Sequence, residues 1–217
     1  MNKLEELIKR LCPNGVEYKR LNEVFENFNG MTGVSNKWKE LGNCQFIEYM
    51  NAYKNLKINT NVLPFATVKK LEQNTLKKGD ILLTCASETP DECAIASVIE
   101  DEIKDNVFLD DHLFGIRVNE VMKNKINTTF MNYYMHTNNF RRQVNKAVRG
   151  VTRFYISIDN FMQICIPVPP LEIQEEIVHI LDNFTKLSAE LSAELSARNN
   201  QFSYYREKLI DSKTPKA

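Results

Sequence analysis

IPVPPLEIQEEIVHILDNFTKLSAELSAELSARNNQFSYYREKLI occupies residues 166–210, and this stretch decides the architecture of the chain. It opens with three prolines in four residues, a composition that suits neither a helix interior nor a central strand. The forty residues from Leu171 to Ile210 then contain no glycine or proline. They predict one helix that would be about 60 Å long at 1.5 Å per residue. We therefore expect a globular part to end, and a rod to begin, at residues 166–170.

Apolar side chains in the predicted helix recur mostly in alternating steps of four and three, which is the spacing of a coiled-coil seam. Two consecutive steps of four form a stutter, inside three copies of a Leu-Ser-Ala-Glu-like unit over residues 187–198. Packing of the rod on its own domain is the alternative, but the rod exceeds the diameter of a domain of about 170 residues. The first apolar position of the seam is Ile173. We expect pairing with a second long helix through the positions that follow it, namely Ile177, Ile180, Phe184, Leu187, Leu191, Leu195, Phe202, Tyr205 and Leu209.

The first 165 residues mix short strand patterns with helical ones. The predicted strands cover residues 45–49, 65–68, 80–85, 94–99, 113–118 and 154–158. The predicted helices cover residues 3–11, 18–25 and 128–147, and a loop is expected at residues 29–39. The fold class is therefore α+β. A mixed α/β domain is expected over residues 1–170, a spacer helix over 171–212 and a tail over 213–217.

Charge is balanced overall but unevenly distributed, with 28 basic and 28 acidic side chains. Residues 88–111 hold nine acids and one base, whereas residues 121–158 hold seven bases and no acid. The second stretch can form a basic face for phosphate, although solvated surface charge is the simpler interpretation. No apolar run is long enough for a membrane span, and no signal peptide is evident. The five scattered cysteines suit a reducing cytoplasm, which is the expected location.

Catalytic and cofactor motifs are missing from the sequence. There is no GxGxxG, no phosphate-binding P-loop and no Gly-x-Ser-x-Gly elbow. The Asn-Pro-Pro-aromatic signature of adenine-methylating enzymes is missing too. Asp110, Asp111 and His112 form the one acid–histidine cluster, and a lone cluster in a turn before a strand is a weak signal for a metal site. We therefore expect no catalysis, no cofactor and no metal.

Two segments combine basic, hydrogen-bonding and aromatic side chains in the manner of a DNA-binding surface. Arginine and lysine at helical spacing can contact successive phosphates, and an arginine fork can read guanine. Gly150 would let the backbone approach a ligand closely. The candidate DNA contacts from the two segments are Thr32, Lys37, Trp38 and Lys39, then Arg142, Lys146, Arg149, Thr152, Arg153 and Tyr155.

Several stretches, in order, resemble the DNA-specificity subunits of type I restriction–modification systems. They are Cys12–Lys19, Leu76–Leu82, Ser87–Pro90, Gly150–Arg153 with Ile156-Ser157, Ile166–Val178, the Leu-Ser-Ala-Glu repeat and Tyr204–Leu209. Ser87 and Thr89, from one of these stretches, join the candidate DNA contacts. The chain departs from the family in length, because members usually hold two recognition domains and two antiparallel helices in about twice as many residues. It resembles a half-subunit.

The resemblance implies a non-catalytic protein that reads half of an interrupted site in double-stranded DNA. Its helix would pair with a second copy or with another half-subunit. The pair would scaffold modification subunits, which bind S-adenosylmethionine and methylate adenine, and in some systems motor–nuclease subunits. Two alternatives remain open, namely a coiled-coil adaptor whose head binds protein and an enzyme that acts alone on nucleic acid.

Overall fold

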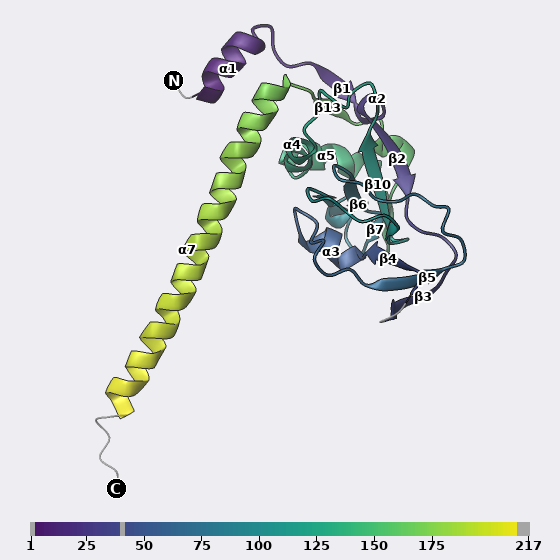
Figure 1. Cartoon of the computed structure of the whole chain (residues 1–217). Helices are drawn as coiled ribbons and strands as arrows, with labels where there is room; N and C mark the ends of the chain where they lie inside the picture. Colours follow the sequence, from purple (N-terminus) through teal and green to yellow (C-terminus); the bar gives the residue numbers. More distant parts are fainter. Residues whose placement is uncertain (1–2, 40–41, 212–217) are drawn as a thin grey trace. The chain divides into compact units, whose positions relative to one another are not determined.

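The computed structural model describes residues 3–39 and 42–211, without the side chains of residues 35–39 and 211 (Figure 1). The chain forms two compact units that meet after Glu175. The first unit holds thirteen short strands in four sheets among the described residues, together with six short α-helices and the start of the long helix. This is the mixed α/β architecture with a long C-terminal helix that the sequence predicts.

A four-stranded antiparallel sheet forms the centre of the first unit. Its strands, in order, are β2 (Phe25–Asn29), β10 (Leu113–Val118), β6 (Ile81–Thr84) and β8 (Ala96–Val98). All residues of β6 and β8 are buried, which explains why Ile81–Leu83 in β6 form a continuous apolar run instead of an alternating pattern. Asp80, fully buried just before β6, receives two 2.7 Å hydrogen bonds from the Arg117 guanidinium on β10. This bidentate pair ties the two strands together at one end of the sheet.

A second four-stranded sheet lies beside it, in the order β3 (Val34–Lys39), β5 (Phe65–Val68), β4 (Cys44–Ile47) and β9 (Val107–Leu109). The expected loop over residues 29–39 is correct only for residues 30–33, because β2 extends to Asn29 and β3 covers Val34–Lys39. Pairing with β10 and β5 overrides the weak strand propensity of the Asn and Ser residues in β2 and β3. At Gly30 a Cβ atom would lie 2.1 Å from the Asp110 carbonyl oxygen, so the close approach requires glycine.

Two smaller sheets, one of two strands and one of three, complete the first unit. β1 (Tyr18–Arg20) pairs with β13 (Cys165–Pro167), and β11 (Val148–Gly150), β12 (Phe154–Ile156) and β7 (Ala86–Ser87) form a three-stranded sheet. The predicted helix over residues 18–25 is wrong at both ends, since only α2 (Leu21–Val24) is helical. Backbone pairing of residues 18–20 with β13 replaces helical hydrogen bonds there.

The remaining helices are short. They are α1 (Lys3–Leu11), α3 (Tyr49–Lys54), the 3-10 turn η1 (Pro90–Glu92), α4 (Thr128–Met135), α5 (Asn138–Ala147) and α6 (Ile158–Phe161). The predicted helix over 128–147 is therefore two helices. Thr137 separates them, because its hydroxyl oxygen accepts a hydrogen bond from the Phe140 backbone N–H and starts a new helix.

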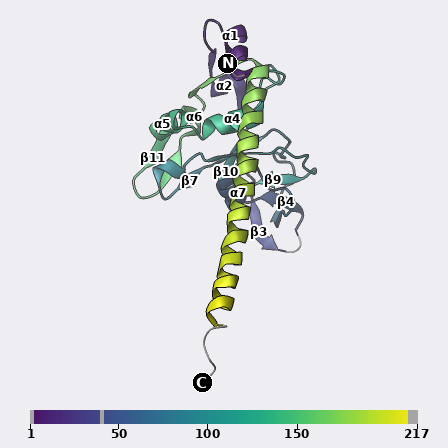
Figure 2. The ribbon, with the colours of Figure 1, turned by 90° about the vertical axis from the view of Figure 1, so that its left-hand side faces the viewer.

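The helix α7 (Leu171–Asp211) is continuous over 41 residues (Figures 1 and 2). Its first turn belongs to the first unit, where the buried Gln174 side chain bonds to three backbone groups. The Gln174 Nε2 donates to the Lys125 and Pro169 carbonyl oxygens at 2.8 and 2.7 Å, and its Oε1 accepts from the Asn127 N–H at 2.8 Å. From Glu176 the helix forms the second unit. In the described part of the chain, no helix is both long and apolar enough to cross a membrane.

Candidate nucleic-acid interface

The basic stretch after α5 forms a β-hairpin. Arg149 faces Tyr155 and Gly150 faces Phe154 across the antiparallel pair β11–β12, which leaves Val151, Thr152 and Arg153 as the loop. Gly150 has φ of +117°, and a Cβ atom there would lie 2.1 Å from the Arg153 carbonyl oxygen. Only glycine fits this position. All three loop residues are exposed, with Val151 at 90%. The hairpin therefore presents an exposed tip whose turn geometry requires Gly150.

The hairpin is joined to a segment more than sixty residues earlier in the chain. Strand β12 pairs with β7, so that Tyr155 faces Ala86 and Phe154 faces Ser87. The Ile156 N–H also donates to the Cys85 carbonyl oxygen at 3.0 Å. This sheet brings together six of the candidate DNA contacts, in it or directly beside it: Ser87, Thr89, Arg149, Thr152, Arg153 and Tyr155.

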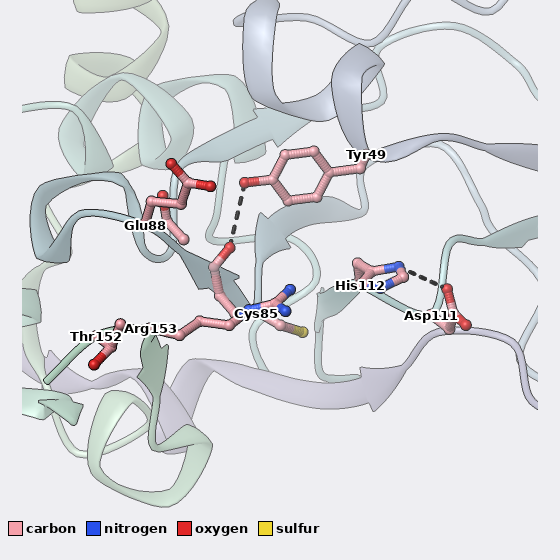
Figure 3. Close-up of a pocket in the computed structure, with 9 residues that line it drawn as sticks. Tyr49, Cys85, Glu88, Asp111, His112, Thr152 and Arg153 are labelled. Carbon is pink, nitrogen blue, oxygen red and sulfur yellow. Dashed lines mark hydrogen bonds and ion pairs between the residues drawn. The ribbon is translucent and has the colours of Figure 1, made fainter. Parts of the chain in front are cut away.

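A cavity of about 910 Å³ opens between this sheet and its neighbours (Figure 3). Thr152 and Arg153 reach it from the hairpin loop, Glu88 from the segment after β7, and Tyr49 from α3. The Tyr49 hydroxyl donates to the Ala86 carbonyl oxygen at 3.3 Å. The lining thus combines one guanidinium, carboxylates and an aromatic ring, which can donate to, accept from and stack on a polar ligand.

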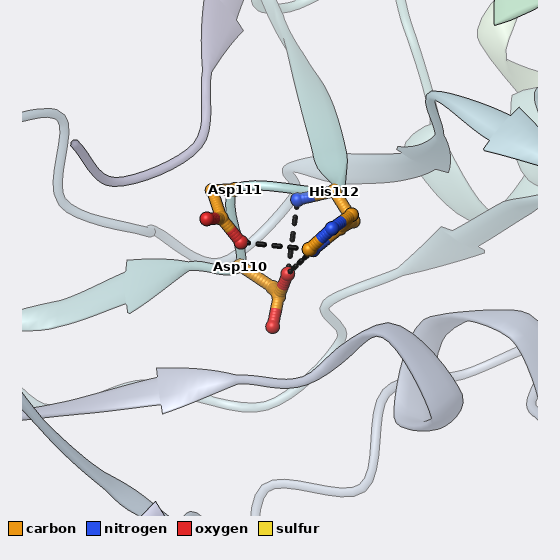
Figure 4. A group of neighbouring side chains, drawn as sticks. All are labelled: Asp110, Asp111 and His112. Carbon is orange, nitrogen blue, oxygen red and sulfur yellow. Dashed lines mark hydrogen bonds and ion pairs between the residues drawn. The ribbon is translucent and has the colours of Figure 1, made fainter. Parts of the chain in front are cut away.

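The acidic turn before β10 also contributes to the cavity through Asp111 and His112 (Figure 4). The His112 Nδ1 lies 3.0 Å from Asp110 Oδ1 and 2.9 Å from Asp111 Oδ1, and Asp110 Oδ1 also accepts from the His112 backbone N–H at 2.9 Å. Three potential metal ligands are therefore close together. In this structure their side chains bond to one another.

Cys85 lines the same cavity but is a poor nucleophile. Burial, and then the nearby negative charge of Asp110, raises the pKa of the Cys85 thiol to about 12. The thiol therefore stays protonated at neutral pH, and only the thiolate attacks electrophiles.

Behind the cavity, Glu92 organises the segment after β7. Its two carboxylate oxygens accept hydrogen bonds from the Tyr53 hydroxyl at 2.6 Å and from the Ser87 hydroxyl at 2.7 Å. These bonds, the one from Tyr53 first, lower the pKa of Glu92. Since the Ser87 proton points to Glu92, the Ser87 oxygen can only accept a further hydrogen bond from a ligand. The Thr89 N–H also points to this oxygen, at 3.4 Å.

The arginines of the basic stretch differ in exposure, because Arg141 is partly buried whereas Arg142, Arg149 and Arg153 are exposed. The Arg141 guanidinium donates to the backbone carbonyl oxygens of Asp91, Cys93 and Ala94 at 2.6–2.9 Å, and burial lowers its pKa. Arg141 thus anchors the segment after β7 to α5, a role that residue type alone does not reveal.

Arg141 is not one of the candidate DNA contacts. The three basic candidates before the hairpin loop, Arg142, Lys146 and Arg149, are exposed. Arg142 and Lys146 lie on α5, one turn apart, and Arg149 lies on β11. The Arg149 guanidinium donates to the Lys146 and Val148 carbonyl oxygens at 3.0 Å. A line of cations therefore leads along the helix into the hairpin.

The second candidate segment lies on a different sheet. Thr32, in the turn before β3, donates through its backbone N–H to the Gln73 Oε1 at 2.6 Å. Lys37, Trp38 and Lys39 belong to β3, an edge strand, and their side chains lie outside the described part of the structure. Tyr49, Glu88 and Asp111 join the hairpin cavity although the sequence did not single them out as DNA contacts. Of these three residues, only Glu88 lies next to candidate DNA contacts in the sequence, between Ser87 and Thr89.

Comparisons with known proteins agree with this architecture. The family model described as the type I restriction modification DNA specificity domain matches residues 13–198. The EcoR124I/EcoR124II specificity subunit of Escherichia coli is 49% identical over 63 residues, which are 26% of this chain and 16% of that protein. A putative type I restriction enzyme specificity subunit of Haemophilus influenzae is 38% identical over 97 residues, covering 41% of this chain and 24% of its own length.

Solved structures share the fold at low sequence identity. A chain from a study of complex assembly and conformational transition in the type I R-M system superposes with a TM-score of 0.66 at 20% identity, over 92% of this chain and 45% of its own length. The HsdS subunit from Thermoanaerobacter tengcongensis gives 0.56 at 19% identity, over 87% of this chain and 44% of that one. The chain thus spans about half the length of these structures. Because the family model matches most of its residues, the chain belongs to the family of type I restriction modification DNA specificity domains.

Proposed function

We propose that this chain is the non-catalytic DNA-recognition subunit of a type I restriction–modification complex, and that the β11–β12 hairpin reads one half of a bipartite site. The observation that carries the proposal is the hairpin tip itself. Its turn depends on Gly150, its three loop residues are exposed, its strand β12 pairs with β7, and a line of exposed cations precedes it.

The chemistry of this surface divides into two parts. Arg142, Lys146 and Arg149 fit the phosphate backbone, which supplies affinity without sequence information. A two-stranded β-ribbon fits the major groove, where Arg153 can donate two hydrogen bonds to guanine and the Ser87 oxygen can accept one from an amino group. Thr89, Thr152 and Tyr155 flank these groups, and Thr32, Lys37, Trp38 and Lys39 form a second contact region in the proposal.

The partners follow from the family. Modification subunits that bind S-adenosylmethionine would supply methyl transfer to adenine, with motor–nuclease subunits in some systems. Two copies of this chain, paired antiparallel through α7, would present two identical hairpins and read an interrupted palindrome. The exposed apolar side chains along α7, among them Phe184, Leu191 and Leu195, support this arrangement.

Binding to a randomised DNA duplex library, by the chain co-purified with its modification subunit, tests the recognition role. Selected duplexes should share a short motif, and Arg153→Ala should relax one position of it at a cost of about 1–3 kcal/mol. Arg142→Ala, Lys146→Ala and Arg149→Ala should instead weaken all duplexes equally and each flatten the salt dependence by about one unit. A folded complex that selects no sequence would favour a protein-binding head over a DNA reader.

A further inference from the structure

Two opposite charges meet at the open end of the three-stranded sheet. Strand β12 pairs antiparallel with β7, so that Phe154 faces Ser87. Continued by one position, the same register places Arg153 of the hairpin loop opposite Glu88. Both residues are exposed, and both line the hairpin cavity of about 910 Å³ (Figure 3). A guanidinium and a carboxylate are therefore neighbours at the surface that is proposed to meet DNA.

These two side chains are available to a ligand. Neither the Glu88 carboxylate nor the Arg153 guanidinium has a hydrogen bond or ion pair with any residue that the structure describes. A transient contact between two such exposed groups is weak in water and would open at little cost. The Ser87 hydroxyl, one residue earlier, donates to Glu92 and can only accept from a ligand. This end of the sheet therefore offers one fork of donors beside acceptors.

One edge of a base pair matches this arrangement. In the major groove a G·C pair presents two neighbouring acceptors, guanine N7 and O6, followed by one donor, the cytosine N4 amino group. An arginine fork matches the two acceptors, and a carboxylate matches the donor. An A·T pair presents its donor between two acceptors, so the fork finds no neighbouring acceptors there. A phosphate group would repel the carboxylate, because both are negative.

We propose that Glu88 reads the cytosine of the same base pair whose guanine Arg153 reads. The Glu88 carboxylate would accept a hydrogen bond from the cytosine N4 amino group while the Arg153 guanidinium donates to guanine O6 and N7. This inference rests on the proposed function and adds Glu88 as a second specificity-determining residue. It also fixes the orientation of the base pair, because exchange of the two bases would place the carboxylate against the guanine acceptors.

Selection from a randomised duplex library, by the chain with its modification subunit, tests the assignment. The unaltered chain should select G·C at one position, and Arg153→Ala and Glu88→Ala should each lower the preference at this same position by about tenfold or more. Glu88→Ala should not weaken binding to unrelated duplexes, because it removes a negative charge. Glu6→Ala, which removes the same exposed side chain from α1, is the matched control and should keep the whole motif.

A base analogue tests the contact without any change in the protein. At this position the cytosine is replaced by 2-pyrimidinone, which lacks the amino group, and the unaltered chain should bind the duplex about tenfold more weakly. Glu88→Ala should lose much less, because its contact with the amino group is already missing. Comparison of the two chains cancels the effect of the analogue on the duplex itself. The same analogue in the unread gap is the control and should leave binding unchanged.

The outcomes separate this inference from the proposed function. Relaxation at two different positions, or an equal loss with the analogue in both chains, would overturn the shared base pair. A uniform change in affinity for all duplexes in Glu88→Ala would overturn it as well, because Glu88 would then act through its charge alone. Circular dichroism checks that each variant is folded. If the unaltered chain selects no motif, the proposed function fails, and this inference fails with it.

Discussion

Deletion of one repeat unit, Leu191–Glu194, should shorten the gap between the two half-sites that the complex reads. Four residues are removed from each helix, so the separation of the two recognition units along the paired rods falls by about 6 Å. One base pair occupies about 3.4 Å of duplex. The unread gap should therefore shrink by one or two base pairs, while both half-site sequences stay the same.

The repeat makes this deletion tolerable. Leu195 takes the place of Leu191, so the apolar seam continues and pairing should survive. Four residues turn a helix by about 400°, which rotates each recognition unit by about 40° past a full turn. Insertion of one more Leu-Ser-Ala-Glu unit should lengthen the gap by the same amount.

The assay is methylation of a plasmid library in which the gap between fixed half-sites varies by single base pairs. Ser192→Ala with Glu194→Gln is the matched control, because it changes the composition of the unit without changing its length and should keep the original gap. The reasoning is refuted if the deletion variant is folded and dimeric yet still methylates sites with the original gap.

Three further predictions concern the scaffold and the cavity. Gln174→Ala should lower the free energy of unfolding by at least about 2 kcal/mol in urea titrations, because three buried backbone groups lose their partner; an unchanged midpoint would contradict this. Arg117→Ala should lower the free energy of unfolding by about 3–5 kcal/mol in the same titration, because the buried Asp80 carboxylate loses its guanidinium partner. The double variant Arg117→Ala with Asp80→Ala should lower it by less, because no buried charge is left behind. At pH 8 iodoacetamide should modify the exposed Cys165 while Cys85, with its raised pKa, is about one part in 10⁴ thiolate and stays unmodified, as peptide mass mapping would show.

The sequence predicts the long helix and most of the central strands because their signals are local. Pro170 followed by forty residues without a helix breaker defines α7, and the apolar run at Ile81–Leu83 defines β6. Strand β3 is not predictable in this way, because its strand conformation depends on pairing with β5 across the sheet. The break between α4 and α5 has a local signal, the cap at Thr137, which the apolar stripe obscures.

The candidate site likewise has features that the local sequence predicts and features that depend on contacts between distant segments. Basic composition and Gly150 indicate the hairpin segment, but its pairing with β7 joins residues more than sixty positions apart. Arg141 and Arg142 are adjacent in sequence, yet one anchors backbone carbonyls and the other is exposed. Their different roles depend on where the segment after β7 folds back, and no sequence spacing encodes that. The DNA contacts themselves stay predictions.

The most direct test of the account is the methylome of cells in which this chain is the sole specificity subunit, co-expressed with its modification subunit. Single-molecule sequencing should find methylated adenines in one interrupted palindrome, with the two half-sites related by two-fold symmetry, and no methylation when Arg153, Arg149 and Lys146 are all replaced by alanine. An asymmetric bipartite motif would contradict pairing of two identical copies, and a genome methylated without any shared motif would contradict DNA recognition by this chain.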